Sequence, residues 1–261
     1  SLYLRSLNAV TVGGVGDVGL TYARFDSGRT AQTDAGLEGV SASAGAAKLR
    51  SAGAVTVNEA FAAGGDALVL TDAGGVTLNA GLTAGGLATV VAADGIAQNA
   101  DIAAGGDVYV AARNGDAAMA AGAQTTSSGG SVRYAASGNV ALGRLAAADA
   151  ASVVAGGDIA DADNDLTANV TAGRARLAAG GSIGTGGGAQ SDDNAGAVDL
   201  AVGNVEASAG GSLYLRSLNA VTVGGVGDVA LTYARFDSGR TALTDADLDG
   251  VSASTGTAKL R

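Results

Sequence analysis

The amino-acid sequence predicts an all-β fold, a parallel β-helix (β-solenoid) whose coils hold about 20–30 residues each. Three observations predict it. A Gly-Gly pair recurs along the chain, short runs that alternate apolar and polar residues follow these pairs, and a long segment is repeated almost unchanged. Alternation with a period of two is typical of half-buried strands.

The Gly-Gly pairs set the length of the predicted coil. The segments "AAGGDALVL" at Ala62–Leu70 and "AAGGDVYV" at Ala103–Val110 show the pattern, and the first glycine of each pair stands at positions 64, 85, 105, 129, 156, 180 and 210. Steps of 20 to 30 residues are typical of a solenoid with loops of variable length. Gly, Asn and Asp suit its corners, because these residues adopt a positive φ at low cost.

The alternating runs predict which side chains fill the coil. Tyr3, Tyr109 and Tyr214 fall on the outward side of their runs. Helices are not expected, because glycine interrupts every Ala-rich segment at a cost of about 1 kcal/mol each. Ala fills much of the narrow core, and the larger predicted inward residues are Leu2, Leu4, Val10, Val12, Leu68, Leu70, Val76, Leu78, Val108, Val110, Val132, Ile159, Ile183, Val198 and Leu200.

Residues 1–50 recur at 212–261, and only six of the fifty positions differ. We therefore expect one continuous solenoid segment over 1–261, made of a 211-residue unit at 1–211 and a partial second copy at 212–261. We expect the chain to be a segment of a longer tandem array. The glycine pairs predict nine coils in each unit if the first 64 residues hold three, and nine coils would advance a fibre by about 43 Å.

Composition excludes several classes of function. The chain has no Cys and no His, which excludes disulfides, thiolate metal sites and the Ser/His/Asp or Cys/His catalytic arrangements. A formal net charge of −10 opposes nucleic-acid binding, which needs Lys and Arg against phosphates. The uncharged stretches alternate in polarity, so we expect no membrane insertion of this segment. With 47% hydrophobic residues the chain is too apolar for a disordered tail.

The patterns "AGGDVYV", "AGGSLYL" and "AAGGSIGTGGG…VDLAVGNVEASAGGSLYL" resemble the haemagglutinin-type repeats of filamentous haemagglutinin-like exoproteins of the bacterial two-partner secretion pathway. The resemblance covers nearly the whole chain. It implies a right-handed parallel β-helix that serves as an adhesin, a biofilm fibre or the stalk of a contact-dependent toxin. Neither the secretion domain nor a toxin tip of that family has a counterpart here.

Two motifs suggest ligand sites. "GVGDVG", with Gly14, Gly16 and Gly19, has the spacing of a dinucleotide-binding loop, but a strand-like run follows it where a helix should. The acidic segments at Asp161–Asp165 and Asp245–Gly250 place carboxylates at alternate positions, as calcium loops do. Neither has a Glu at the twelfth position. We therefore expect no cofactor and no metal.

A carboxylate-based enzyme would draw on Asp107, Asp158, Arg133, Arg174 and Arg176. We expect no enzyme, because the aspartates recur at the same coil position, as corner residues do, and the two arginines around Ala175 are typical of an exposed strand face.

The expected function is a structural or adhesive rod on the bacterial surface, outside the cell, with neighbouring repeats or copies of itself as partners. The alternative is recognition of a host or matrix glycan or protein by the longer loops at 25–39 and 236–250, which carry an aromatic residue, an Arg and several carboxylates.

Overall fold

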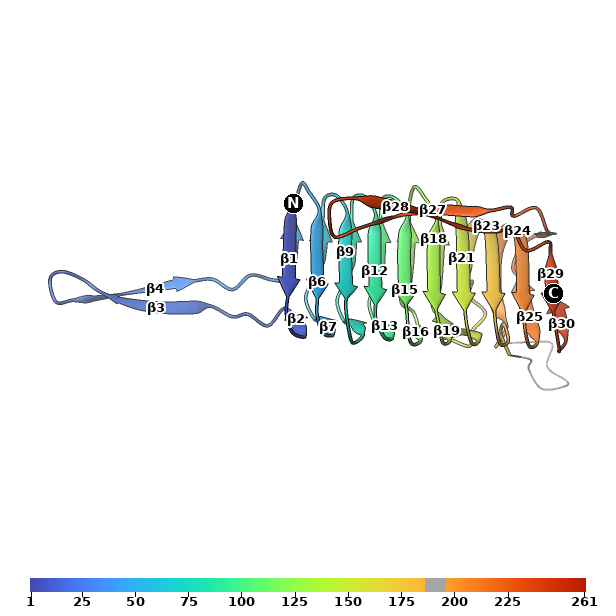
Figure 1. The fold of residues 1–261 in the computed structure, drawn as a ribbon, viewed down its shortest axis with the longest axis horizontal. Helices are drawn as coiled ribbons and strands as arrows, with labels where there is room; N and C mark the ends of the chain where they lie inside the picture. Colours follow the sequence, from blue (N-terminus) through green and yellow to red (C-terminus); the bar gives the residue numbers. More distant parts are fainter. Residues whose placement is uncertain (186–195) are drawn as a thin grey trace.

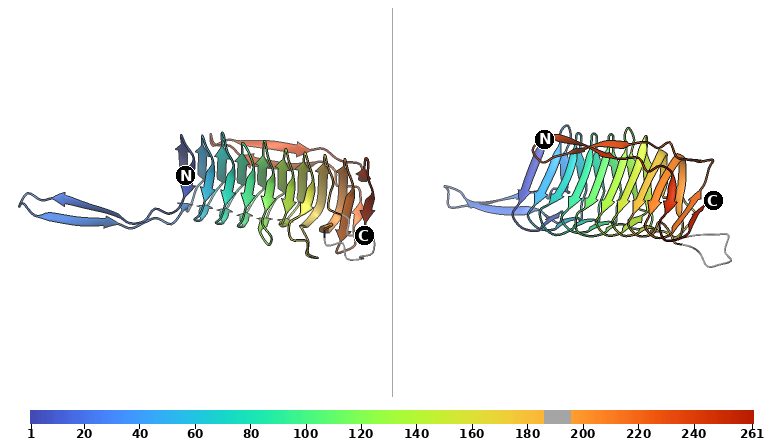
Figure 2. Two further views of the ribbon diagram at one scale, coloured as in Figure 1. Left: turned by 90° about the horizontal axis from the view of Figure 1, so that it is seen from below. Right: turned by 45° about the vertical axis from the view of Figure 1, so that its right-hand side comes forward.

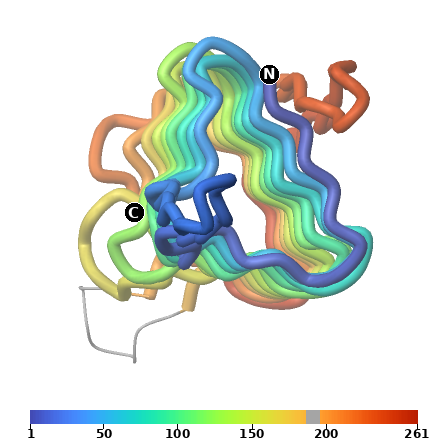
Figure 3. The backbone as a smooth tube through the Cα atoms, turned by 90° about the vertical axis from the view of Figure 1, so that its left-hand side faces the viewer, coloured from blue at the N-terminus to red at the C-terminus, as the bar shows by residue number. Residues whose placement is uncertain are grey.

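The computed structural model describes residues 1–185 and 196–261, and within these residues it contains strands and turns but no helix. The strands stack in parallel as a β-solenoid of about eight turns, so the predicted fold is confirmed (Figure 1). Seen along its axis, the stacked coils enclose a tube (Figure 3), and the strand pairings form three ladders along it. None of the described residues forms a helix that is long and apolar enough to span a membrane.

Each side of the tube is a ladder of parallel strands, one from each coil. Side 1 contains β1 (Leu2–Ser6), β6 (Ala47–Ser51), β9 (Ala67–Thr71), β12 (Ala88–Ala92), β15 (Val108–Ala112), β18 (Val132–Ala136), β21 (Ala150–Ala155) and the second halves of β23 (Val170–Ala179) and β24 (Val198–Ala209). Side 2 contains β2 (Val10–Val12), β7 (Val55–Val57), β10 (Val76–Leu78), β13 (Ile96–Gln98), β16 (Ala117–Met119), β19 (Val140–Leu142) and β22 (Ile159–Asp161). Side 3 contains β5 (Val40–Ala42), β8 (Phe61–Ala63), β11 (Leu82–Ala84), β14 (Ile102–Ala104), β17 (Gln124–Ser127), β20 (Arg144–Ala147) and the first halves of β23 and β24.

The strand register shows about eight turns in a unit, so the predicted nine coils are wrong. On side 1 it runs through Leu2, Ala47, Ala67, Ala88, Val108, Val132, Ala151, Ala175 and Val205. After the first turn the coils take 19 to 30 residues, as predicted. The first turn takes 45, because β3 (Val18–Ala23) and β4 (Arg29–Asp34) leave the coil as an antiparallel hairpin. The prediction gives the first 64 residues three turns, whereas the strand register gives them about two.

The Gly-Gly pairs lie at corners, where backbones of adjacent coils come too close for a side chain. A Cβ on Gly85 would overlap the carbonyl oxygen of Gly64, and a Cβ on Gly180 would overlap that of Gly156. The pairs occupy two different corners, however. Those from 64 to 129 lead into side 1, whereas those from 156 to 210 lead into side 2. The aspartates that follow the pairs therefore lie at two corners, and the prediction that they share one coil position is wrong.

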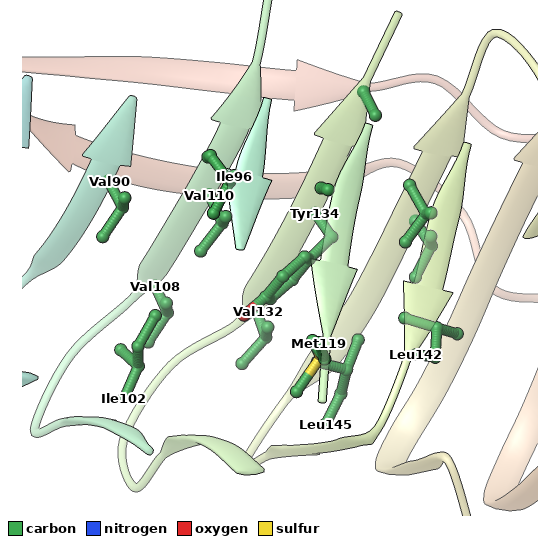
Figure 4. Packing of buried hydrophobic residues seen from close by; sticks show 14 of the residues in the cluster. Val90, Ile96, Ile102, Val108, Val110, Met119, Val132, Tyr134, Leu142 and Leu145 are labelled. Atoms are coloured by element: carbon green, nitrogen blue, oxygen red, sulfur yellow. The ribbon is translucent and has the colours of Figure 1, made fainter. Parts of the chain in front are cut away.

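The core fills the tube with Val, Leu, Ile and Ala (Figure 4). Twelve of the fifteen predicted inward residues lie in it or pack against it, and Leu2 is half-buried in the first turn. Leu68 and Leu70 are the exceptions. In β9 the alternation is shifted by one residue, so Ala67 and Val69 point inward and the two leucines lie on the outer side. Two aromatic residues, Phe61 and Tyr134, lie inside the tube, and the hydroxyl of Tyr134 (Figure 4) lies 2.6 Å from Thr125 Oγ1.

The second copy continues the stack, but it is rotated by one side of the tube. Leu2 lies on side 1, whereas its counterpart Leu213 stacks on Ile183 and Ile159 of side 2. The shift of the glycine pairs from one corner to the next explains this rotation. The strands of the second copy are β25 (Leu213–Ser217), β26 (Thr222–Val223), β29 (Val251–Ala253) and β30 (Ala258–Leu260).

The second copy also contains an antiparallel hairpin, formed by β27 (Val229–Ala234) and β28 (Arg240–Asp245). It folds back along the outside of the coils, whereas β3–β4 projects beyond the first coil (Figures 1 and 2). Both hairpins extend from their own coil in the same direction along the axis (Figure 1). We call β27–β28 the docked hairpin and β3–β4 the free hairpin.

Candidate functional site: the lateral row and the two hairpins

One row of outward-facing side chains runs along side 1, with one residue from each coil. The strand register aligns Tyr3, Lys48, Leu68, Thr89, Tyr109, Arg133, Ser152, Arg176 and Glu206. We call these nine residues the lateral row. The row is buried or half-buried along most of its length because the docked hairpin lies on it, and Lys48 and Arg133 are only 2% and 9% exposed.

The docked hairpin buries an apolar face against the coils. Val226, Val229, Leu231 and Ala234 are each at most 3% exposed, and the ring of Tyr233 stacks on Tyr109 of the lateral row with 4.8 Å between centroids. Burying a Val or Leu side chain contributes about 1.5–3 kcal/mol. Apolar burial is therefore a main source of the free energy of docking.

A buried ion pair fixes the end of β28, where the hairpin strands leave the base. Arg133 donates from Nε and Nη2 to the two carboxylate oxygens of Asp245 at 2.7 and 2.9 Å, and Ser152 Oγ donates to the same carboxylate at 2.6 Å. Burial opposes ionisation of Asp245, but the hydrogen bonds and the charge of Arg133 outweigh it and hold the pKa of this carboxyl below its usual range. Arg176 lies beside this pair and donates from Nε to the carbonyl oxygen of Ala246 at 2.6 Å.

Glu206 holds the base of the docked hairpin from the preceding coil. Its two carboxylate oxygens each accept a backbone N–H, from Val226 and from Leu248, both at 3.1 Å. Burial opposes ionisation of Glu206, but hydrogen bonds from Asp247 and from these two amides keep its pKa below the usual range. One buried carboxylate thus ties the two ends of the hairpin together.

The tip of the docked hairpin reaches the first coil. Lys48 Nζ donates to the carbonyl oxygen of Arg235 at 2.5 Å, and the ring of Phe236 meets Tyr3 edge-on at 6.2 Å. Arg240 forms two hydrogen bonds with Asp66, at 2.8 and 3.0 Å. The hairpin therefore extends along the lateral row from Glu206 to Tyr3, the whole length of the unit.

The free hairpin has the same conformation without a surface to cover. Its strands pair Val18 with Asp34 through Ala23 with Arg29, the same register as Val229–Asp245 through Ala234–Arg240. The tips also agree, since Ser27 and Ser238 both have a positive φ, of 65° and 69°. Its large apolar side chains are exposed: Val15 65%, Val18 59%, Leu20 62%, Tyr22 46% and Phe25 109%.

The structure gives roles to the five residues of the hypothetical carboxylate site. Asp107 and Asp158 are corner residues, as predicted, and they accept the backbone N–H of Ser131 and Ser182 in the next coil at 2.8 and 2.6 Å. The three arginines lie on the outer side of their strands. The predicted exposure of Arg174 and Arg176 is wrong, because Arg174 is half-buried and Arg176 is buried. Arg133, Arg174 and Arg176 all bond to the segment between Val226 and Ala246.

The acidic segments are used in hydrogen bonds within the fold. Asp161 accepts from Asn169 at 2.8 Å and Asp165 from the amide of Thr167 at 2.6 Å, while Asp245 is paired with Arg133. No group of three or more His, Cys, Asp or Glu side chains within 1–185 and 196–261 is arranged to hold a metal ion. Part of one quoted repeat motif, residues 186–188, lies outside the described residues.

The "GVGDVG" glycines form the entry to the free hairpin. Gly14, which has a φ of 76°, leads from β2 toward β3, and its amide donates to Glu59 Oε1 at 2.8 Å. A strand follows, as expected, where a dinucleotide-binding loop would have a helix.

The two loops that we predicted as contact surfaces form the second halves of the hairpins and their exits. Residues 236–250 lie against the coils of the same chain, whereas most of residues 25–39 is exposed. The sequence did not indicate Lys48, Leu68, Thr89 or Glu206 as partners of the hairpin. Their common feature, one outward position per coil, becomes visible only once the coils are aligned.

Comparison with protein families, with curated proteins and with solved structures finds no match in any of the three. The fold and the lateral row define the class of the molecule. It is a parallel β-solenoid built from tandem units, with a hairpin of one unit docked along the side of the unit before it.

Proposed function

We propose that this chain is a structural segment of a bacterial extracellular fibre, a stiff repetitive rod of an adhesin or biofilm filament. One observation carries the proposal. The second copy of the unit stacks on the coils of the first with parallel register, since β24 pairs with β25, β26 and β29, so that the rod can grow by whole units. The resemblance to filamentous haemagglutinin-like exoproteins supports a location outside the cell. No catalytic role is part of this proposal.

The stability of such a rod grows in proportion to its length. Each coil buries Val, Leu, Ile and Ala side chains against its neighbours, at about 25 cal/mol per Å² of apolar surface. Each coil contacts mainly the adjacent coils, as in other solenoids, so every added coil contributes a similar free energy. Acidic surface charge favours solubility of the rod.

The length of the particle tests this function. A chain extended by one more unit, residues 1–211 followed by residues 1–261, should be longer than the 261-residue chain by about 40 Å, the rise of roughly eight strand spacings. Small-angle scattering and negative-stain images measure both lengths. A thicker or branched particle of unchanged length would contradict the rod.

Recognition of a glycan by the free hairpin is the second candidate, because the hairpin exposes Tyr22 and Phe25 together with Arg24. A glycan array probed with the chain and with a Tyr22→Ala/Phe25→Ala variant tests it. Binding that is lost in the variant supports recognition. Tyr233→Ala/Phe236→Ala in the docked hairpin is the matched control and should leave such binding unchanged.

A further inference from the structure

The free hairpin leaves an apolar face without a partner, and the same chain shows what covers that face in the second copy. Val15, Val18 and Leu20 are 65%, 59% and 62% exposed, whereas their counterparts Val226, Val229 and Leu231 are at most 3% exposed. A preformed hairpin with exposed apolar residues is an interaction surface.

We propose that β3–β4 is a docking arm for the lateral row of a preceding copy of the 211-residue unit. The inference rests on the proposed function in one respect, since both need units in tandem, and it adds the interface that joins them. The partner is identified by its side chains, which are an arginine in the middle of the row, a glutamate at its base and a lysine with a tyrosine at its far end.

The residues that make three main contacts of the docked hairpin with the coils are present in the free one. Asp34 corresponds to Asp245, which pairs with Arg133, and Arg29 corresponds to Arg240, which pairs with Asp66. Tyr22 corresponds to Tyr233, which stacks on Tyr109. The free hairpin can therefore make the same three contacts on an equivalent row.

Most positions that differ between the copies lie away from the buried contacts, and the exception is Asp247, whose side chain hydrogen-bonds to Glu206. Ala230, Asp247 and Asp249 of the docked hairpin are exposed and Leu243 is half-buried. They stand where the free hairpin segment has Gly19, Gly36, Glu38 and Gln32. The residues that contact Arg133, Asp66 and Tyr109 are thus unchanged between the copies, whereas Gly36 cannot make the side-chain contact of Asp247 with Glu206.

Shape and direction agree with the same partner. The free hairpin already has the strand register and tip of the docked form, so docking requires little further ordering of its backbone. It extends along the axis away from its own coils, which is the direction in which a preceding unit would lie (Figures 1 and 2).

At the base of each hairpin, one glutamate accepts two backbone amides, and this glutamate comes from a different neighbouring coil in the two copies. In the second copy, Glu206 of the preceding coil binds the amides of Val226 and Leu248. In the first copy, Glu59 of the following coil binds the amides of Gly14 and Gly39 at 2.8 and 2.6 Å. A unit with neighbours on both sides would have both carboxylates, which would fix the arm between two coils.

The extended chain of residues 1–211 followed by residues 1–261 tests the proposal by amide hydrogen exchange. It contains three hairpins, and the middle one has the residues of β3–β4 with a preceding unit beside it. We expect the amides of the middle hairpin to exchange at least about tenfold more slowly than those of the first, at rates like those of β27–β28. Equal rates in the first and middle hairpins would overturn the proposal.

A charge variant shows whether the slowing depends on the lateral row. Arg133→Ala in the first unit alone should return the middle hairpin to fast exchange and leave the last hairpin protected. The same substitution in the second unit alone should release only the last hairpin. A middle hairpin that stays protected with Arg133→Ala in the first unit would contradict docking on this row.

A cross-link gives a readout that does not depend on exchange rates, because the chain has no cysteine. The amide of Ala234 donates to Thr89 Oγ1 at 3.0 Å. Thr89→Cys in the first unit with Ala23→Cys in the second should therefore form an intramolecular disulfide under mild oxidation. Thr33→Cys replaces Ala23→Cys in the control, since its counterpart Thr244 is exposed.

Equal cross-linking in the two pairs would overturn the proposal. The length of the same extended chain tests the proposed rod independently of the docking arm. Extension by about 40 Å without arm protection would reject docking and keep the proposed function.

Discussion

The two hairpins have the same strand register and the same tip, yet one is buried along eight coils and the other extends into solvent. The difference shows that the hairpin conformation is determined locally. Asp26 and Asp237 accept the amides of Gly28 and Gly239 in the two tips, at 3.0 and 3.1 Å. Docking is a separate step, and it depends on whether a lateral row lies beside the hairpin.

The largest difference between the hairpins should come from Asp245→Ala. The substitution leaves Arg133 buried without its carboxylate, and breaking a buried ion pair in this way costs about 3–5 kcal/mol. We expect the docked hairpin to open, with fast hydrogen exchange over residues 229–245 and an unchanged coil. Asp34→Ala in the free hairpin is the matched control, and it should change neither the hydrogen exchange of residues 229–245 nor the coil. Unchanged protection in Asp245→Ala would mean that the apolar contacts suffice for docking.

Glu206→Gln sharpens the comparison at the hairpin base. A glutamine has one acceptor oxygen in place of two, so one of the amides of Val226 and Leu248 loses its partner, at a cost of about 1–3 kcal/mol. Glu59→Gln should likewise leave one of the amides of Gly14 and Gly39 without its partner. Residue-resolved exchange should show each variant loosening only its own hairpin, and loosening of both by one variant would contradict separate clamps.

Acid should release the docked hairpin and leave the conformation of the free one unchanged. The pKa of Asp245 is lowered in the folded protein, so its ionised form stabilises docking above the unfolded-state pKa of about 3.9. This contribution is lost as the pH falls through the lower folded-state pKa. Hydrogen exchange of 229–245 measured from pH 6 to pH 3, corrected for intrinsic rates, measures the loss. In Asp245→Asn only the part of the pH dependence that Glu206 contributes should remain, because the pKa of Glu206 is also lowered in the folded protein.

Calcium should have the smallest effect. The docked hairpin has Asp247 and Asp249 where the free one has Gly36 and Glu38, so an ion needed by the fold would be supported in only one copy. We expect a chelator to leave the melting temperature nearly unchanged, because only a ligand of the native state stabilises it. A rise of many degrees with millimolar calcium would contradict this expectation.

The periodic features of the fold were predictable from the sequence, and the contacts between distant segments were not. Alternating residues such as Val108 and Val110 identify the core without knowledge of their neighbours. Leu68 and Leu70 were assigned to the wrong side because both faces of β9 are apolar, with Ala67 and Val69 inside. The pairing of Arg133 with Asp245, 112 positions apart, depends on the alignment of coils of unequal length.

The rotation of the second copy by one side of the tube makes the relation between successive units a screw operation. Leu213 takes the place on side 2 that Leu2 holds on side 1, so a third copy would start on side 3 and a fourth would return to side 1. Docked hairpins would then wind around the filament, with one on any given flank about every 120 Å. A flat surface that touches one flank would meet a hairpin in every third unit and bare coils in the other two.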